Sequence, residues 1–303
     1  MKRPVIVATR RSALALAQAR AWMADFTRAT GVTTEELHVV TTGDRIVDRA
    51  LNEIGGKGLF IKEIEEAVRQ GRADCAVHSL KDVPAELAPG LVLACIPERA
   101  DPRDAVQTTS GRGFRELPSG AKVGTSSLRR ITQLKLLRPD LHYVPLRGNV
   151  DTRLAKCERG EVDAVIVAMA GLQRLGFADR CVEVLDPDLC LPAVGQGALA
   201  VECRADDSPL QQSLLQVNDT ETQLAVWAER GVMLAVEGSC QVPVAAYATR
   251  QGQQIWLRAM LAEADGSNVR FDDARAPWPS TSAEAFDLGR RLGERLKAAT
   301  AEA

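Results

Sequence analysis

Residues 4–39 read PVIVATRRSALALAQARAWMADFTRATGVTTEELHV, and this stretch decides the fold class. Residues 4–9 form a short apolar run of the kind that builds a buried strand. Residues 12–30 carry apolar side chains at helical spacing, and Gly31 stands where a helix-ending glycine is expected. Residues 36–42 predict a second strand. Because parallel strands need a crossover, this strand–helix–strand order predicts a parallel α/β sheet.

The same alternation continues in two blocks separated by a proline-rich turn. In the first block we predict a helix over 58–71 and strands over 75–80 and 91–96. After the turn at 97–106, the second block predicts strands at 121–126, 141–146 and 163–170, and helices at 127–139 and 149–161. Two α/β halves joined by crossing segments imply a cleft, and ligands bind such sheets at the carboxyl ends of the strands.

Beyond residue 218 the pattern changes to one helix, three strand-like runs and a final helix, which predicts an α+β domain with a three-stranded antiparallel sheet. The predicted architecture is therefore two α/β domains followed by this small third domain. Its boundaries are residues 1–98 with 198–216 for the first domain, 103–192 for the second and 220–303 for the third.

Composition narrows the class of protein. The net charge of −2 over 303 residues argues against binding to nucleic acid or to acidic membranes. The apolar run near the N-terminus is too short for a secretion signal, and no run is long enough to span a membrane, so we expect a cytoplasmic protein. Seven cysteines without a CxxC pair and only three histidines predict neither disulfides nor a metal site.

Two segments place arginines and hydroxyls between a strand and a helix. In ATRRS, residues 8–12, Arg10 and Ser12 open a helix, and they either face a bound anion or are a solvated arginine and a capping serine. In GTSSLRR, residues 124–130, the same arrangement recurs. The second segment holds four candidate residues: Thr125, Ser127, Arg129 and Arg130. Adjacent arginines at a helix start oppose the helix dipole, so a bound anion is expected to offset that cost.

Further cations follow the neighbouring strands. Arg147 and Arg153 lie in LRGNVDTR, residues 146–153, and Arg174 follows the next strand. Together the arginines predict a site for a ligand rich in carboxylates or phosphates.

One carboxylate stands among these cations. VHSLKDVP, residues 77–84, ends a strand with Ser79, Lys81 and Asp82, and Asp82 is placed either to form a turn or to meet a positive charge on a substrate. The glycine-rich loop IGGKGLF, residues 54–60, carries Lys57 but lacks phosphate-loop spacing, which favours a mobile lid.

A lone cysteine stands in VEGSCQVPV, residues 236–244. From the residues alone, Cys240 is a spare thiol, half of a disulfide, a metal ligand or a covalent attachment point.

Eight segments in order resemble the porphobilinogen deaminase family, also called hydroxymethylbilane synthases. They are RRSALALAQ, GGKGLF, DCAVHSLKDVP, ERADPRDA, GTSSLRR, LRGNVDTRL, LPAVGQGALAVECR and EGSCQVPVAAYA. The resemblance implies a transferase of tetrapyrrole and heme biosynthesis with three domains, the first two similar to type II periplasmic binding proteins. Such enzymes link four porphobilinogen units into linear hydroxymethylbilane with release of ammonia, and they usually work as monomers.

The resemblance also implies residue roles. Cys240 carries a dipyrromethane cofactor through a thioether, and Asp82 is the catalytic aspartate that contacts pyrrole nitrogens. The side chains implied to bind cofactor and substrate are Arg10, Ser12, Asp44, Lys57, Ser79, Lys81, Thr125, Ser127, Arg129, Arg130, Arg147, Arg153, Arg174 and Gln196. Two positions depart from the family pattern: Ser239 stands where a glycine is common, and Ala13 where a proline is common.

Two other classes of protein remain as alternatives. A two-lobed carboxylate-binding receptor or sensor explains the arginines but leaves Asp82 and Cys240 without a role. A cysteine-nucleophile hydrolase requires a histidine paired with Cys240, and the sequence offers no evident one.

Overall fold

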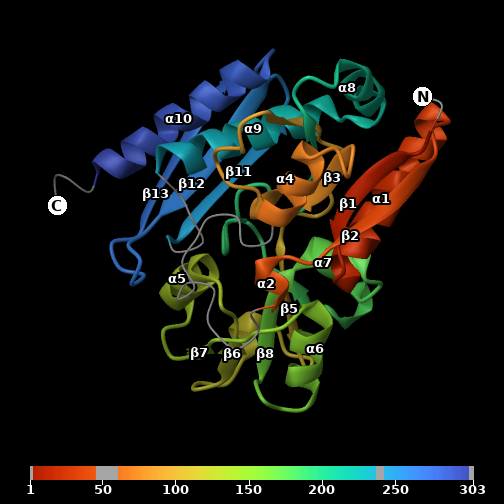
Figure 1. Ribbon diagram of the computed structural model, residues 1–303. Coiled ribbons are helices and arrows are strands. Elements are labelled where there is room, and N and C mark those ends of the chain that lie inside the picture. The colour runs from red at the N-terminus through yellow and green to blue at the C-terminus, as the bar shows by residue number, and fades with distance from the viewer. Residues whose placement is uncertain (1–2, 46–60, 237–241, 300–303) are drawn as a thin grey trace. The chain divides into compact units, whose positions relative to one another are not determined.

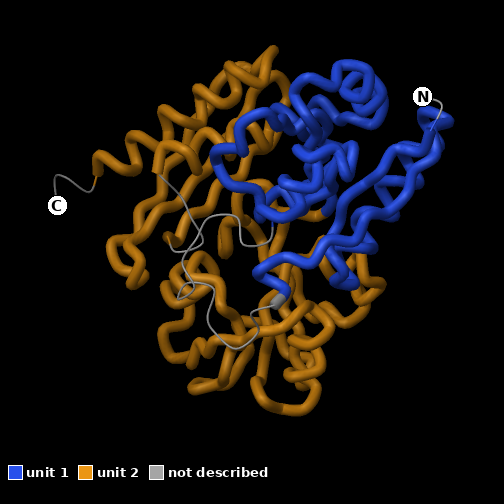
Figure 2. Tube along the Cα trace, in the orientation of Figure 1, with its two compact units in different colours: residues 1–100, 198–224 blue, residues 101–197, 225–303 orange. Residues whose placement is uncertain are grey.

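The computed structural model describes residues 3–45, 61–236 and 242–299. The chain divides into two compact units, each built from two stretches of sequence (Figure 2). Residues 1–100 and 198–224 form unit 1, and residues 101–197 and 225–303 form unit 2. Unit 1 holds one five-stranded sheet, whereas unit 2 holds a second five-stranded sheet and a three-stranded antiparallel sheet. The predicted class of fold is thus confirmed, while the three-domain boundaries stay a prediction.

The sheet of unit 1 has the strand order β2-β1-β3-β10-β4. Its strands are β1 (Val5–Arg10), β2 (Thr34–Val39), β3 (Cys75–Ser79), β4 (Leu91–Cys95) and β10 (Leu199–Arg204). Strand β1 runs parallel to β2 and β3, as predicted, but β10 is antiparallel to β3 and β4. The sheet is therefore mixed, and not parallel throughout as predicted. Strand β10 enters unit 1 as the chain returns from unit 2, and it runs into the sheet from the opposite end.

Several helices accompany this sheet (Figure 1). They are α1 (Ala13–Thr30), α2 (Thr42–Arg45), α4 (Lys62–Arg69), η1 (Leu80–Asp82), α8 (Ser208–Leu214) and η4 (Leu215–Val217). Helix α1 begins as the sequence predicts, because the Ser12 Oγ accepts a hydrogen bond from the Ala15 N–H at 3.3 Å. It ends at Gly31, whose φ of 70° is the left-handed conformation that glycine adopts without strain. Ala13 opens this helix without disrupting it.

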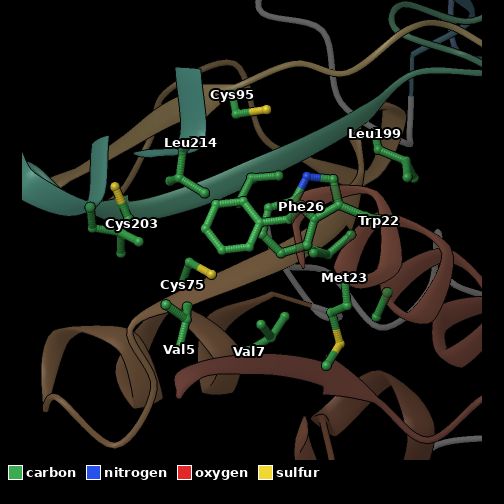
Figure 3. Packing of buried hydrophobic residues seen from close by; sticks show 14 residues of the cluster. Val5, Val7, Trp22, Met23, Phe26, Cys75, Cys95, Leu199, Cys203 and Leu214 are labelled. Atoms are coloured by element: carbon green, nitrogen blue, oxygen red, sulfur yellow. The ribbon is translucent and has the colours of Figure 1, made fainter. Parts of the chain in front are cut away.

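One buried cluster of unit 1 packs α1 and α8 against the sheet (Figure 3), and a second packs α4 against it. Trp22 and Phe26 stack with ring centroids 5.1 Å apart, against Val5 and Val7 of β1. Cys75, Cys95 and Cys203 are free thiols buried in the same cluster. Burial raises the pKa of Cys95 to about 12, so this thiol stays protonated and packs as a small apolar group.

The five-stranded sheet of unit 2 has the order β7-β6-β8-β5-β9. Its strands are β5 (Asp104–Thr108), β6 (Lys122–Gly124), β7 (His142–Val144), β8 (Ala164–Ala168) and β9 (Glu183–Val184). The accompanying helices are η2 (Phe114–Glu116), α5 (Leu128–Leu137), α6 (Val150–Glu158), α7 (Met169–Arg174) and η3 (Ala178–Arg180). Strand β6 is parallel to β7 and β8, whereas β5 is antiparallel to β8 and β9. Residues 97–106 were predicted as a turn, but their last three residues are the start of the buried strand β5.

The three-stranded sheet follows α9 (Thr220–Ala235), whose first turn belongs to unit 1. It consists of β11 (Val244–Gln251), β12 (Gln254–Leu261) and β13 (Arg270–Pro277), and α10 (Ser282–Ala298) packs along β12 and β13 (Figure 1). Helices α9 and α10 touch backbone to backbone: a Cβ on Gly289 would lie 1.8 Å from the Ala228 carbonyl oxygen. No helix among the described residues is long and apolar enough to cross a membrane.

Candidate functional site

A pocket in unit 1 brings together three of the predicted residues. Arg10 at the end of β1, Ser79 at the end of β3 and Asp82 in η1 line it, together with Gln18 and His78. The strands β1 and β3 are parallel neighbours, so their carboxyl ends meet at one edge of the sheet. The structure thus places a cation, a hydroxyl and a carboxylate around one space.

Arg10 is held in place by Asp44. The Arg10 Nε lies 3.0 Å from the Asp44 Oδ1, and an Arg10 terminal nitrogen contacts the same oxygen. Thr41 donates its hydroxyl to the other Asp44 oxygen at 2.8 Å. Burial acts to raise the pKa of Asp44, but these hydrogen bonds and the nearby guanidinium give a net lowering. Asp44 therefore stays charged and orients Arg10.

Asp82 is exposed at the end of η1, as is Lys81 beside it. The backbone below them is fixed, because the Leu80 N–H donates to the Ala198 carbonyl at 3.0 Å and Leu80 is buried. Ser79 exchanges hydrogen bonds with the Gln18 amide at 2.9 and 3.1 Å. Asp82 is consequently an accessible carboxylate on a rigid support.

In unit 2, Arg129 and Arg130 are buried and share one internal carboxylate, that of Asp104. The Arg129 Nη2 lies 2.8 Å from the Asp104 Oδ2, and the Arg130 Nη2 lies 2.7 Å from Oδ1. The sequence predicted that a bound anion offsets the charge of two arginines at this helix start. Part of that charge is offset by a side chain of the protein, Asp104. Gln196 joins the group, since its amide nitrogen lies 2.9 Å from the Asp104 Oδ1.

The hydroxyls of this segment organise the start of α5. Ser127 accepts a hydrogen bond from the Arg130 N–H at 3.4 Å, and Thr125 accepts one from the Ser127 N–H at 3.2 Å. Ser126, which was not selected as a candidate, exchanges hydrogen bonds with the Leu146 backbone. These contacts fix the helix start that carries the two arginines.

Three more arginines lie half-buried in unit 2. Burial, with Arg130 and Arg147 nearby, lowers the pKa of Arg153 to about 10. Arg153 donates from Nε to the Gly148 carbonyl at 2.8 Å. Burial likewise lowers the pKa of Arg174 to about 10, and its Nη2 donates to the Gly197 carbonyl at 2.7 Å. Arg130, Arg147 and Arg153 therefore repel one another, and a polyanionic ligand would relieve that repulsion.

Three positions singled out by the sequence lie outside the described residues. They are Lys57 of the glycine-rich loop, Ser239 and Cys240. The expectations of a lid and of a covalent attachment point therefore stay predictions.

Sequence reasoning missed Gln18, His78 and Asp104. Gln18 has a visible signal, since it is a polar residue on the apolar face of α1. His78 lies next to a selected serine, and its Nε2 lies 3.0 Å from the buried Glu202 Oε2. Asp104 lies in ERADPRDA, one of the segments that carry the family resemblance, but the prolines and charged residues before it predict only a turn.

Fold and site together define an α/β protein with an arginine cluster in one unit and a carboxylate-bearing pocket in the other. Two family models identify the family to which this chain belongs. Residues 5–212 match the model described as "Porphobilinogen deaminase, dipyromethane cofactor binding domain", and residues 223–298 match "Porphobilinogen deaminase, C-terminal domain". The chain belongs to the porphobilinogen deaminase family, a family of transferases that bind a dipyrromethane cofactor.

Curated relatives named porphobilinogen deaminase align with most of this chain. A porphobilinogen deaminase of Sorangium cellulosum is 57% identical over 98% of this chain and 99% of the relative. Another, from Roseiflexus sp., is 50% identical over 89% of each chain. A third, from Syntrophotalea carbinolica, is 47% identical over 98% of this chain and 93% of the relative.

Among solved structures, substrate-binding domain 2 of Lactococcus lactis GlnP is similar with a TM-score of 0.43 and 9% identity, over 71% of this chain and 87% of that chain. The VFT2 domain of Bordetella pertussis BvgS gives a TM-score of 0.40 and 17% identity, over 70% and 85%. Both likenesses are too distant to bear on function.

Proposed function

We propose that this chain joins four porphobilinogen units head to tail, releases ammonia at each joining and frees linear hydroxymethylbilane by hydrolysis. The proposal is carried by a chain of the porphobilinogen deaminase family that has an accessible Asp82 in unit 1 and an arginine cluster in unit 2. A cytoplasmic location and a monomeric state stay predictions.

The residues of unit 2 suit dipyrromethane, whose acetate and propionate groups are anionic. Arg129, Arg130, Arg147 and Arg153 form a cation cluster in which Asp104 is the buried counter-charge, so net positive charge remains for carboxylates. When bound through a thioether to Cys240, the cofactor supplies the pyrrole carbon to which the first unit is joined. A thioether resists hydrolysis, which suits an anchor retained over many cycles.

Asp82 stabilises positive charge on the substrate. Loss of ammonia from porphobilinogen leaves a pyrrole cation whose charge is shared between the ring nitrogen and the exocyclic carbon. A fixed carboxylate beside that ring lowers the energy of the cation and accepts a hydrogen bond from the ring N–H. The rigid backbone at Leu80 keeps Asp82 in position without reorganisation during the reaction.

The cations and hydroxyls hold the substrate by its carboxylates. Arg10, oriented by Asp44, is placed to bind an acetate or propionate beside Asp82. The other side chains proposed for this role are Ser12, Lys57, Ser79, Lys81, Thr125, Ser127, Arg129, Arg130, Arg147, Arg153 and Arg174, with Gln196 in support.

Product stoichiometry tests the proposal. Purified protein incubated with porphobilinogen is expected to consume four substrate molecules and release four ammonia molecules for each linear product. Substrate consumption, ammonia and product are measured in the same sample. A carboxylate-binding receptor would bind porphobilinogen without releasing ammonia, and that result would overturn the proposal.

A further inference from the structure

Asp104 is the centre of a buried polar cluster in unit 2. It is the first residue of β5 and is 0% exposed, and its partners lie on α5 and on the segment before β10. One of its oxygens accepts from the Arg130 Nε at 3.0 Å and Nη2 at 2.7 Å. The other accepts from the Arg129 Nη2 at 2.8 Å. A single carboxylate thus bridges two adjacent guanidinium groups.

Neutral partners complete the shell around this carboxylate. The Gln196 amide lies 2.9 Å from Oδ1, and the Cys190 thiol lies 3.3 Å from Oδ2. Although burial acts in the opposite direction, the two guanidinium groups hold the pKa of Asp104 well below its usual range. Asp104 is therefore charged, enclosed by protein and unable to touch a substrate itself.

The two arginines keep donors that this cluster does not use. Among the described residues, Arg129 contacts Asp104, Cys190 and the Leu191 carbonyl, which occupies three N–H groups. Arg130 makes two contacts with Asp104 and one with the Ile166 carbonyl, again three. A guanidinium has five N–H groups, so each arginine retains two that have no partner in the described part of the chain. Two cations and one anion also leave one net positive charge.

We propose that Asp104 is a positioning residue of the anion site: it fixes the Arg129 and Arg130 side chains so that their remaining N–H groups bind a carboxylate of the cofactor or substrate. This inference rests on the proposed function, because it assigns these arginines to carboxylate binding. Asp104 acts through the arginines and takes no part in the chemistry.

Physical chemistry favours fixing these two side chains before a ligand arrives. Each free arginine loses rotamer entropy when it is immobilised, and this cost weakens ligand binding unless the side chain is already fixed in the folded protein. The contacts with Asp104 immobilise both arginines when the protein folds, so this entropy is not lost on binding. Asp104 also allows two like charges to lie side by side in a buried place, which would otherwise raise the free energy of the folded protein.

The test compares Asp104→Asn with Asp74→Asn. Asparagine keeps the shape of Asp104 but removes the charge that holds both guanidinium groups. Asp74 is a matched control, because it is a buried carboxylate of unit 1 paired with Arg3 at 2.7 Å and lies outside the candidate site. For each variant, folding is followed by circular dichroism, cofactor loading by intact mass, and KM and kcat with porphobilinogen.

We expect folded Asp104→Asn to lose most of its covalent cofactor or to show a KM raised about tenfold or more, the loss expected for weakened charge-assisted hydrogen bonds. Asp74→Asn is expected to lower the melting temperature and to keep normal loading and KM. If Asp104→Asn behaves as Asp74→Asn does, Asp104 is a purely structural ion pair and the inference fails.

A second variant covers the case in which Asp104→Asn does not fold. Asp104→Glu keeps the charge but moves both guanidinium groups by about one methylene, so a positioning role predicts the same loss of loading or rise in KM. Normal loading and KM in this variant overturn the inference. If the wild-type protein carries no adduct and consumes no porphobilinogen, the proposed function itself fails, which is a distinct result.

Discussion

Asp82→Asn is expected to lower the turnover of porphobilinogen by about a hundred- to a thousandfold, the range seen when one fixed electrostatic partner of a transition state is removed. The substitution keeps the shape of the side chain and removes its negative charge. A neutral amide no longer stabilises the pyrrole cation left when ammonia departs. Substrate binding is expected to change little, because the cations that hold the carboxylates are untouched.

Stopped-time assays of kcat and KM, with circular dichroism on the same samples, measure this effect. Asp82 is exposed, so the free energy of unfolding is expected to change by no more than about 0.5 kcal/mol. Glu86→Gln is the matched control, because it neutralises an exposed carboxylate four positions further along the same segment. Near-normal kcat in Asp82→Asn, or an equal loss in Glu86→Gln, would remove Asp82 from the mechanism.

Gly289→Ala is expected to destabilise the protein by about 3 kcal/mol or more, although alanine is the better helix former by about 1 kcal/mol. The added Cβ would lie 1.8 Å from the Ala228 carbonyl oxygen and 3.0 Å from the Val232 nitrogen. Both atoms belong to the backbone of α9 and cannot rotate away. The helices α9 and α10 must separate to admit the methyl group, which opens a buried contact.

Denaturant unfolding measures this difference, with Ala283→Ser as the control. That change also adds one heavy atom to α10, but at an exposed position, and it is expected to alter the free energy of unfolding by less than about 0.5 kcal/mol. Helix α9 leads directly into the segment that contains Cys240, so a loss of cofactor loading is expected alongside the loss of stability. Wild-type stability in Gly289→Ala would show that the two helices are not packed this closely.

Much of the fold could be predicted from local patterns. Ser12 and Gly31 mark both ends of α1, and strands that alternate with helices predict the parallel neighbours β1, β2 and β3. The antiparallel placements of β5 and β10 could not be predicted this way. Each of these strands follows a passage between the units, and strand direction there depends on long-range topology.

The candidate site, like the fold, could be predicted from the sequence only in part. Arg129 and Arg130 were found because two arginines at a helix start are electrostatically unusual. Asp104 was not found, because it lies some 25 residues away in a segment that reads as a turn, and only folding brings it to the arginines. Local sequence patterns thus identify a charge that needs a partner more readily than they identify the partner.

Intact-mass measurement of the purified protein, followed by peptide mapping, tests the central claim most directly. The account predicts a mass that exceeds the sequence mass by a two-pyrrole adduct, which reacts with Ehrlich's reagent and maps to the peptide that contains Cys240. The Cys240→Ser variant is expected to carry no adduct and to make no product. Protein that is fully active without an adduct, or an adduct that maps to another residue, would contradict the account.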